Sequence, residues 1–346
     1  MGVRNLLKFI STNCPTDTNH TNNSSPISSC RFSDLSGKTI VVDASIYMYK
    51  YKQDKTLMES MYRIVITLRY HNVTPVFIFD GKPGIEKDAT VQHRRNVREK
   101  SRNDHMSLQD THQDIVARRT AAKAERYVNL DLIAEFDRDI AKLDPKLEQL
   151  RRSGVSLKRH DFVSVKALFD SMGVIHITPD HEADPLCVKM VNSNIAYACL
   201  TEDTDMFVYG CQRVLRSIDL YNMTFTIYHT NRILATMEMP LDVLRTMCFL
   251  AGTDYCFDAA AGRPSKKQMD LSRMYKKYIG LKNKEEFSQF ADSVLDKNDQ
   301  TLDGFEELYQ YNHCDTSDYK RLCRESRYDE IGTRHIMQDY GFVFVN

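Results

Sequence analysis

The sequence predicts an α/β protein whose mostly parallel central sheet is flanked by helices. Short apolar runs rich in branched residues, typical of buried strands, alternate along the chain with amphipathic helical patterns. This alternation favours parallel strands joined by right-handed crossovers. The strand-like runs are 39–42, 76–79, 174–177, 196–200 and 214–218, and the helical patterns include 57–68 and 161–172.

The composition excludes several classes of protein. The 346 residues are 42% hydrophobic and 27% charged, as expected of a soluble globular enzyme. Nine cysteines without a C-x-x-C pair argue against a disulfide framework and a zinc ribbon, so we expect a reducing compartment. No signal peptide and no run of roughly 18 apolar residues is seen, which predicts an intracellular protein, neither secreted nor bound to a membrane.

Three segments lack strand patterns. Residues 11–31 are rich in Ser, Thr and Asn, which predicts a surface loop. The charged segment 82–159 has no strand-like run and is expected to be helical and mobile, and 258–286 is a second basic stretch. Lys plus Arg and Asp plus Glu both total 47, so nucleic-acid binding would depend on such local clusters rather than on net charge.

Carboxylates follow the predicted strands. Asp43 ends the run TIVVD, Asp80 ends VFIFD, and Asp203 and Asp205 follow YACL in TEDTD. Because ligands bind outside the carboxyl ends of parallel strands, these acids should converge on one crevice.

Three further acids fit the same pattern. Glu182 and Asp184 stand in HEADP after the third strand run, where Asp184 is expected to cap a helix that begins at Pro185. Asp254 follows an apolar helical pattern at 241–250. One Asp at a strand end is usually only a cap or turn residue. Seven acids in matching positions instead predict one functional site, with a merely structural acidic surface as the alternative.

Such a cluster predicts a metal site. Carboxylates crowded into one crevice repel each other by several kcal/mol unless cations neutralise them. Oxygen ligands without cysteine or paired histidine select Mg²⁺ or Mn²⁺. Two such ions, about 3.5 to 4 Å apart, are the usual device for in-line attack on a phosphodiester.

Six segments resemble, in order, the motifs of the flap endonuclease and XPG-type family of structure-specific 5′ nucleases. They are MGVRNLLKFI, VVDASIYMYKY, PVFIFDGKP, ITPDHEADPLC, CLTEDTDMFVYG and FLAGTDYC. The resemblance covers residues 1–10 and 38–256. It implies a PIN-like fold with a helical arch, and two Mg²⁺ ions for which Mn²⁺ can substitute.

The resemblance also implies metal ligands. Asp43, Asp80, Glu182 and Asp184 would hold one ion, while Asp203, Asp205 and Asp254 would lie nearer the second. His181 is more simply a surface residue than a ligand.

Four residues would contact the nucleic acid. Lys87 and Arg94 fall where the family places basic residues on the scissile phosphate, Tyr49 where an aromatic ring stacks on a base, and Gly2 where the N-terminus packs against nucleic acid. Tyr49 could instead fill the core, Lys87 and Arg94 could belong to a solvated helix face, and Gly2 could have no role.

Two basic segments are candidate DNA-binding surfaces. Residues 87–126 carry ten basic and six acidic residues and resemble the arch; the solvated-helix alternative applies most to the part beyond Arg102. After Asp254 the family usually has a glycine-containing helical hairpin, but here only Gly262 stands near the expected turn. A basic helix could grip duplex phosphates instead. The candidate residues are Arg95, Arg98, Lys100 and Arg102 in the first segment and Lys266, Lys267, Arg273, Lys276 and Lys277 in the second.

We therefore expect a nuclease core at 1–256 with an arch insertion at about 82–159, then a basic helical DNA-binding subdomain and C-terminal tail at 257–346. The expected activity is hydrolysis of DNA at 5′ flaps or ends, in replication, repair or recombination, by a monomer that lacks the sliding-clamp motif. The expected location is the nucleus or a site of viral DNA replication, since the short form would suit a large DNA virus. The alternatives are a 5′-to-3′ exoribonuclease and an inactive structure-binding scaffold.

Overall fold

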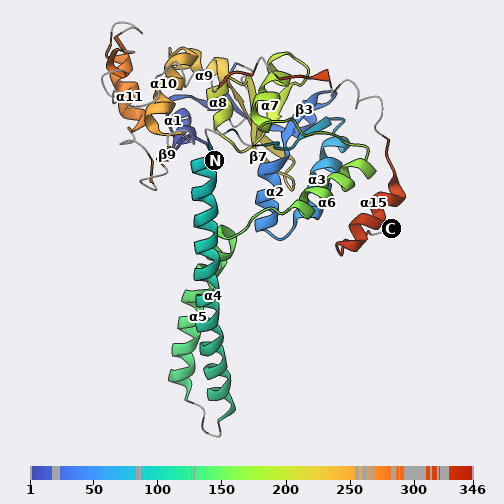
Figure 1. The fold of residues 1–346 in the computed structure, drawn as a ribbon, viewed down its shortest axis with the longest axis vertical. Helices are drawn as coiled ribbons and strands as arrows, with labels where there is room; N and C mark the ends of the chain where they lie inside the picture. The colour runs from blue at the N-terminus through green and yellow to red at the C-terminus, as the bar shows by residue number, and fades with distance from the viewer. Residues whose placement is uncertain are drawn as a thin grey trace.

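An α/β body and a long projecting helical hairpin make up the molecule (Figure 1). The computed structural model describes residues 2–17, 24–82, 84, 87–125, 127, 129–253, 257–258, 263–264, 269–281, 286–287, 289–291, 309–311, 314–317, 319 and 327–344. Among these, no helix is long and apolar enough to cross a bilayer.

An eight-stranded sheet forms the centre of the body, in the order β1-β2-β8-β7-β6-β3-β4-β5. From β7 to β5 all neighbours are parallel, whereas β8 runs antiparallel to both β7 and β2. The strands are β1 (Thr16–Asp17), β2 (Ile27–Arg31), β3 (Thr39–Asp43), β4 (Thr74–Ile78), β5 (Ile175–Ile177), β6 (Ala198–Leu200), β7 (Arg213–Asp219) and β8 (Thr224–His229). The predicted fold class and all five predicted strands are confirmed.

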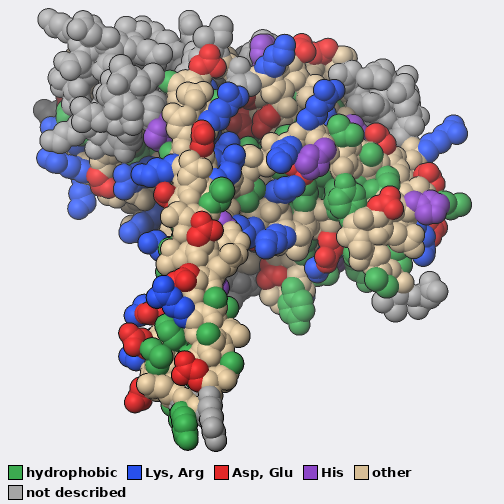
Figure 2. Space-filling model, turned by 60° about the horizontal axis from the view of Figure 1, so that its bottom comes forward, with side chains coloured by type: hydrophobic (Ala, Val, Ile, Leu, Met, Phe, Trp, Pro, Cys, Tyr) green, Lys and Arg blue, Asp and Glu red, His purple; other side chains and the backbone are tan. Residues whose placement is uncertain are grey.

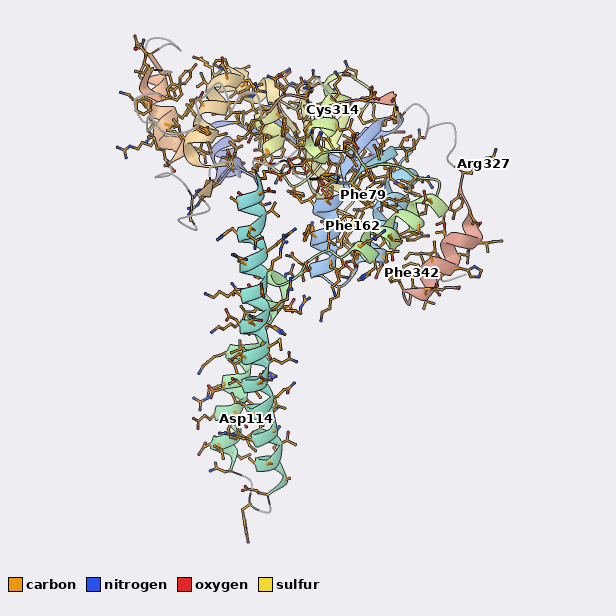
Figure 3. The ribbon with its side chains drawn as sticks, in the orientation of Figure 1. Phe79, Asp114, Phe162, Cys314, Arg327 and Phe342 are labelled. Atoms are coloured by element: carbon orange, nitrogen blue, oxygen red, sulfur yellow. The ribbon has the colours of Figure 1, made fainter. Side chains whose placement is uncertain are left out.

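Helices cover both faces of the sheet. Along β3 the side chains alternate: Val41 packs into one hydrophobic core, and Ile40 and Val42 into the other. The first core lies under α1 (Leu6–Asn13), α7 (Ala183–Asn192), α8 (Asp205–Tyr209), α9 (Thr230–Thr236), α10 (Leu241–Ala251) and α11 (Leu271–Ile279), and the second under η1 (Phe32–Leu35), α2 (Ala44–Gln53), α3 (Leu57–Tyr70) and α6 (Arg159–Ser171). In the second core the rings of Phe79 and Phe162 lie 6.3 Å apart (Figure 3).

Two local expectations were wrong. Residues 11–31 are not one surface loop, because α1 extends to Asn13 and β2 pairs with β8. The backbone ladder, together with the buried Ile27, holds this mostly polar strand in the sheet. Asp184 is not a cap: Glu182 occupies the N-cap and α7 begins at Ala183. Pro185 is tolerated in the first turn, where backbone N–H groups have no helical partner.

The hairpin, which we call the arch, consists of the antiparallel helices α4 (Asp88–Ala124) and α5 (Leu130–Ser153). At 37 residues, α4 is about 55 Å long. Ala122 and Ile133 are buried between the helices, and Arg119 pairs with Asp137 at 2.6 Å. The arch is helical, as predicted for this segment.

The C-terminal segment returns to the body. Helix α15 (Glu330–Asp339) packs on α6, and the Tyr340 hydroxyl donates to Ser164 Oγ at 2.7 Å. Beyond it, the Phe342 ring lies 5.4 Å from that of Tyr62 (Figure 3). The short strands β9 (Phe257–Asp258) and β10 (Arg263–Pro264) pair with each other.

Candidate active site

The carboxyl ends of the parallel strands open into a cavity of about 260 Å³. Asp43 is the last residue of β3, Asp80 follows β4 by two residues, and Asp203 follows β6 by three. Six of the seven predicted acids line this cavity: Asp43, Asp80, Glu182, Asp184, Asp203 and Asp205. The seventh, Asp254, lies outside the described residues.

Hydrogen bonds tie the β3 and β6 ends together. Asp43 caps α2, where its Oδ1 accepts from the Ile46 N–H at 3.3 Å. Its Oδ2 accepts from the Thr201 hydroxyl at 3.0 Å, and Thr201 Oγ1 in turn accepts from the Asp203 N–H at 3.0 Å. The Asp205 N–H donates to Asp203 Oδ1 at 3.0 Å, so the acids belong to one connected network.

Asp80 is held between β4 and α7. Its Oδ1 accepts from the Ala183 N–H at 3.1 Å, which orients the start of α7 and thus Glu182 and Asp184. The next residue, Gly81, donates its N–H to the His181 carbonyl at 2.8 Å. A Cβ at Gly81 would collide with the Pro179 carbonyl, so this close approach of two loops requires glycine. His181 itself is exposed and does not line the cavity.

Gly2 packs directly against the acidic strand ends. Its φ of +86° lies in the left-handed region that glycine adopts readily. A Cβ there would lie 2.7 Å from Asp205 Oδ1 and would collide with Asp203 and Thr204. Gly2 therefore packs against two of the acids that line the cavity, and only glycine fits this position.

The electrostatics of the cavity favour a bound cation. Burial, together with the charges of Asp80 and Asp203, raises the pKa of Asp43 to about 8. Burial and the charges of Asp203 and Asp43 also raise the pKa of Asp184 well above its usual range. Carboxylates in this state gain most from a nearby positive charge, and a donor set of oxygens alone fits a hard divalent ion.

The acidic side chains that line the cavity do not converge on a single point. Across the described part of the chain, no three His, Cys, Asp or Glu side chains form a ready-made metal cluster. Glu182 Oε2 instead pairs with Lys87 Nζ at 2.7 Å, and both Asp43 oxygens accept hydrogen bonds. The carboxylate oxygens of the cavity thus fit a metal ion. In this structure the Glu182 carboxylate is paired with Lys87.

The base of the arch supplies the positive side of the cavity. Lys87 is buried just before α4, and Arg94 and Arg98 follow along that helix as lining residues. Lys and Arg side chains gather where the arch joins the body (Figure 2). Arg95 is exposed and does not line the cavity.

Tyr49 lines the cavity rather than the core. Its side chain is partly exposed, and the Arg98 guanidinium lies over its ring, 5.2 Å from the ring centroid. The tyrosines that fill the core from α2 are Tyr47, which is fully buried, and Tyr51. Tyr49 is therefore placed to meet a ligand in the cavity.

Sequence reasoning missed three residues of the site. Thr201 bridges two of the acids, Ser45 Oγ accepts from the Asp80 N–H at 3.2 Å, and Arg216 supports the turn that carries Asp203. Thr201 and Ser45 stand inside two of the quoted motifs, so their closeness to the acids could have indicated them. Arg216 lies beyond the last acid of its motif and carried no signal.

A larger cavity, of about 570 Å³, lies away from this cluster. Its walls come from the turn before α3, the start of α6 and the C-terminal segment. Its acids are Glu59, on the exposed face of α3, and Asp161, which pairs with Lys52 at 2.6 Å. Glu59 in turn lies 3.7 Å from Arg63, so both acids of this cavity are paired with basic residues, and we place the active site at the smaller cavity.

The basic stretch after Asp254 is described only in part. Lys266, Lys267 and Gly262 lie outside the described residues. Helix α11 carries Arg273, Lys276 and Lys277, and its Leu271 and Met274 are buried against the body.

Sequence comparisons match the two segments of the chain that contain the acids of the cavity. The model of the XPG N-terminal domain matches residues 1–101, and that of the XPG I-region matches 173–254. Flap endonuclease 1 of Methanococcus aeolicus is 24% identical over 298 residues, covering 82% of each chain. Flap endonuclease 1 of Xenopus tropicalis is 24% identical over 80% of this chain and 66% of its own length, so this chain spans just under two thirds of that relative.

Solved structures share the fold. Flap endonuclease-1 from Methanococcus jannaschii superimposes with a TM-score of 0.55 at 20% identity, over 91% of this chain and 96% of its own. The catalytic core of Rad2 in complex with DNA substrate gives a TM-score of 0.58 at 15% identity, over 98% and 99%. The two family models together match just over half of the residues, which confirms the resemblance. The chain belongs to the flap endonuclease and XPG family of metal-dependent 5′ nucleases.

Proposed function

We propose that this protein hydrolyses DNA phosphodiesters at 5′ flaps or 5′ ends, leaving a 5′ phosphate, with two Mg²⁺ ions. The observation that carries the proposal is the arrangement of the cavity: six carboxylates from four strand ends on one side and the basic base of the arch on the other. A scissile phosphate between them would meet bound cations and arginine together.

Oxygen ligands favour Mg²⁺, with Mn²⁺ as a substitute. When bound, the two ions would lower the pKa of the attacking water and stabilise the leaving oxygen. The six acids would hold them, Asp43, Asp80, Glu182 and Asp184 on one side and Asp203 and Asp205 on the other. Asp254 is proposed as a further ligand from its motif.

Residues of the arch base would bind and orient the phosphate. Arg94 and Lys87 would donate charge-assisted hydrogen bonds to its oxygens as negative charge grows in the transition state. Lys87 must leave Glu182 to do so, because its ammonium now pairs with that carboxylate. Binding of a cation by Glu182 would compensate for that loss.

Tyr49, Arg98 and Gly2 would shape the path of the DNA. A base stacked on the Tyr49 ring would take the place of the Arg98 guanidinium or lie beside it. Arg95 faces solvent beside this path, and α11 with the preceding Lys266 and Lys267 would grip duplex phosphates. We propose a monomer that works in replication, repair or recombination, in the nucleus or at a site of viral DNA replication.

A panel of 5′-labelled substrates tests this function. Flaps, nicks, blunt ends and four-way junctions of one sequence are digested with Mg²⁺, and product lengths are read on a gel beside a matched RNA flap and an EDTA control. We expect Mg²⁺-dependent cutting at the DNA flap or 5′ end. Preferred cutting of RNA would favour the exoribonuclease, and binding without cutting the scaffold.

A further inference from the structure

Arg216 lies buried behind the acidic cavity. Its side chain, from β7, is 6% exposed and does not line the cavity. Its Nη1 donates to the Asp203 carbonyl at 2.8 Å and its Nη2 to the Glu202 carbonyl at 2.7 Å. The Glu202 carboxylate lies 3.3 Å from the same guanidinium, so one side chain holds both residues of the turn.

A β-bulge follows Arg216 directly. Arg216 still pairs in register with Thr226, but the pairing of β7 with β8 shifts between Arg216 and Asp219, and Ser217 has a φ of +52°. Bulges change the local direction of a strand and are frequent next to functional sites. The Ser217 N–H donates to Glu202 Oε1 at 2.8 Å, so the bulge anchors the turn from both its side chain and its backbone.

The turn held by Arg216 is the one that presents the acids. Within this turn the Asp203 N–H donates to Thr201 Oγ1, and the Asp205 N–H donates to Asp203 Oδ1. Glu202 points back to Arg216 and, unlike Asp203 and Asp205, does not line the cavity. Repulsion among Asp43, Asp203 and their neighbours pushes the turn away from the site, and charge-assisted bonds to two carbonyls oppose that movement.

We propose that Arg216 is a positioning residue: it clamps the Glu202–Asp203 turn so that the Asp203 and Asp205 carboxylates face the cavity at the spacing that divalent cations need. The inference rests on the proposed metal-dependent function. Residues that orient metal ligands typically change metal affinity by about 10 to 100-fold when they are removed. The clamp should therefore act on cation binding more than on bond cleavage once cations are bound.

Direct Mn²⁺ binding tests the clamp. Mn²⁺ titrations followed by electron paramagnetic resonance compare the wild-type protein with Arg216→Met, which removes the donors, and with Arg216→Lys, which keeps the charge. We expect the Mn²⁺ Kd to rise by about 10 to 100-fold in Arg216→Met and by less in Arg216→Lys. Single-turnover cleavage by Arg216→Met should return to within about threefold of wild type at saturating Mn²⁺, which a purely structural defect would not allow.

Arg213 provides a matched control on the same strand. Its Nε also donates to a backbone carbonyl, that of Tyr197, and its guanidinium lies 4.7 Å from the Tyr197 ring centroid. It does not line the cavity. Arg213→Met should leave the Mn²⁺ Kd unchanged even if it lowers the melting temperature.

Glu202→Gln keeps the proposal testable if Arg216→Met does not fold. This variant weakens the ion pair but leaves both carbonyl bonds, so we expect a smaller rise in Mn²⁺ Kd, of about two- to fivefold. An unchanged Kd in folded Arg216 variants, or an equal change in Arg213→Met, would overturn the clamp. Failure of the wild-type protein to cut any nucleic acid would instead count against the proposed function, because Mn²⁺ binding is read without substrate.

Discussion

The acidic cavity and the arch are built in opposite ways. The cavity depends on contacts between distant parts of the chain, such as the bond from Thr201 to Asp43 across 158 positions. The arch is one continuous segment whose helices pair with each other, as in the ion pair of Arg119 and Asp137. The body therefore fixes the acids through contacts between distant segments, whereas the arch is held together by contacts within one segment.

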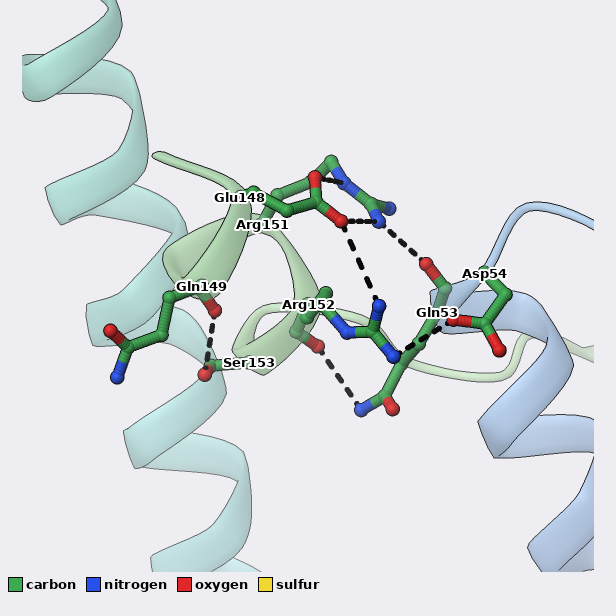
Figure 4. Close-up of polar contacts among 7 residues, drawn as sticks. All are labelled: Gln53, Asp54, Glu148, Gln149, Arg151, Arg152 and Ser153. Atoms are coloured by element: carbon green, nitrogen blue, oxygen red, sulfur yellow. Dashed lines mark hydrogen bonds and ion pairs between the residues drawn. The ribbon is translucent and has the colours of Figure 1, made fainter. Parts of the chain in front are cut away.

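The two regions meet at both ends of the arch. Lys87 pairs with Glu182 where the arch leaves the body. Where it returns, Arg152 pairs with Asp54 at 2.8 Å and Arg151 Nη2 donates to the Gln53 carbonyl at 2.6 Å (Figure 4). Helix α2, which begins after Asp43, ends at Gln53, so one helix connects the acids to the returning end.

Charge also divides the arch. Residues 87–103 carry six basic and two acidic residues, whereas 104–148 carry seven basic and ten acidic residues. Exposed charges more than about 10 Å apart are largely screened at 0.1 M salt. The basic residues where the arch joins the body therefore do not attract DNA to the distal half of the arch. DNA contacts should therefore concentrate at the base of the arch.

Removal of an acid from the cavity should have the largest effect. Asp205→Asn keeps the shape of the side chain but removes a charge from the buried ligand set. We expect kcat to fall by at least about 10³, because the cations supply several kcal/mol of transition-state stabilisation. Binding of a labelled flap in Ca²⁺ should stay within about threefold of wild type.

The matched control is Asp242→Asn, an acid in the first turn of α10 that does not line the cavity. It should cut at the wild-type rate. Undiminished turnover by Asp205→Asn in Mg²⁺ would show that the cavity is not the reaction centre.

The features that sequence could predict are those with a local signature. A buried parallel strand appears as an apolar run, and an acid at its end is easily recognised, so Asp43 and Asp80 were located correctly. Strand β2 has polar side chains, and its partner β8 lies about 200 positions away, so only the ladder reveals it. Arg216 donates to the carbonyls of Asp203 and Glu202, 13 and 14 positions away, and no residue pattern in β7 indicates these contacts.

The second prediction separates the base of the arch from its distal half. Arg94→Ala should slow single-turnover cleavage by roughly 10², because it removes a donor to the charge that develops on the phosphate. Arg118→Ala, on the same helix but paired with Asp114 at 2.9 Å, should change the rate by less than twofold. Equal losses in both variants would mean that the whole arch, rather than its base, contacts the substrate.

The third prediction concerns the returning end of the arch. Arg152 and Asp54 are both partly exposed, and pairs of this kind contribute less than about 1 kcal/mol. A double-mutant cycle of Arg152→Ala and Asp54→Ala should therefore give a coupling below about 1 kcal/mol in the free energy of unfolding. The flap cleavage rate should fall by no more than about fivefold.

A coupling of several kcal/mol would contradict this prediction, because the arch would then be an integral part of the body. The control pair is Arg118 with Asp114, which lies within α4 and cannot connect the two regions.

The smallest expected effect is a pH dependence of the free energy of unfolding that arises from a residue in the α/β body. Burial, with the nearby charges of Arg232 and Arg213, lowers the pKa of His229 from 6.5 to about 4. Above pH 6.5 both the folded and the unfolded chain carry neutral His229. Between pH 6.5 and about 4 the unfolded chain binds a proton that the folded chain rejects, so the free energy of unfolding falls as the pH falls.

Urea midpoints at pH 7.5 and 5 measure this dependence. His229→Gln should lose less stability than wild type over that interval, while its midpoint at pH 7.5 shifts only slightly. His335→Gln in α15 is the control, and it should retain the full wild-type pH dependence. If His229→Gln and wild type lost stability equally, the acid sensitivity would have to come from other groups, and the end of β8 would tolerate a protonated His229.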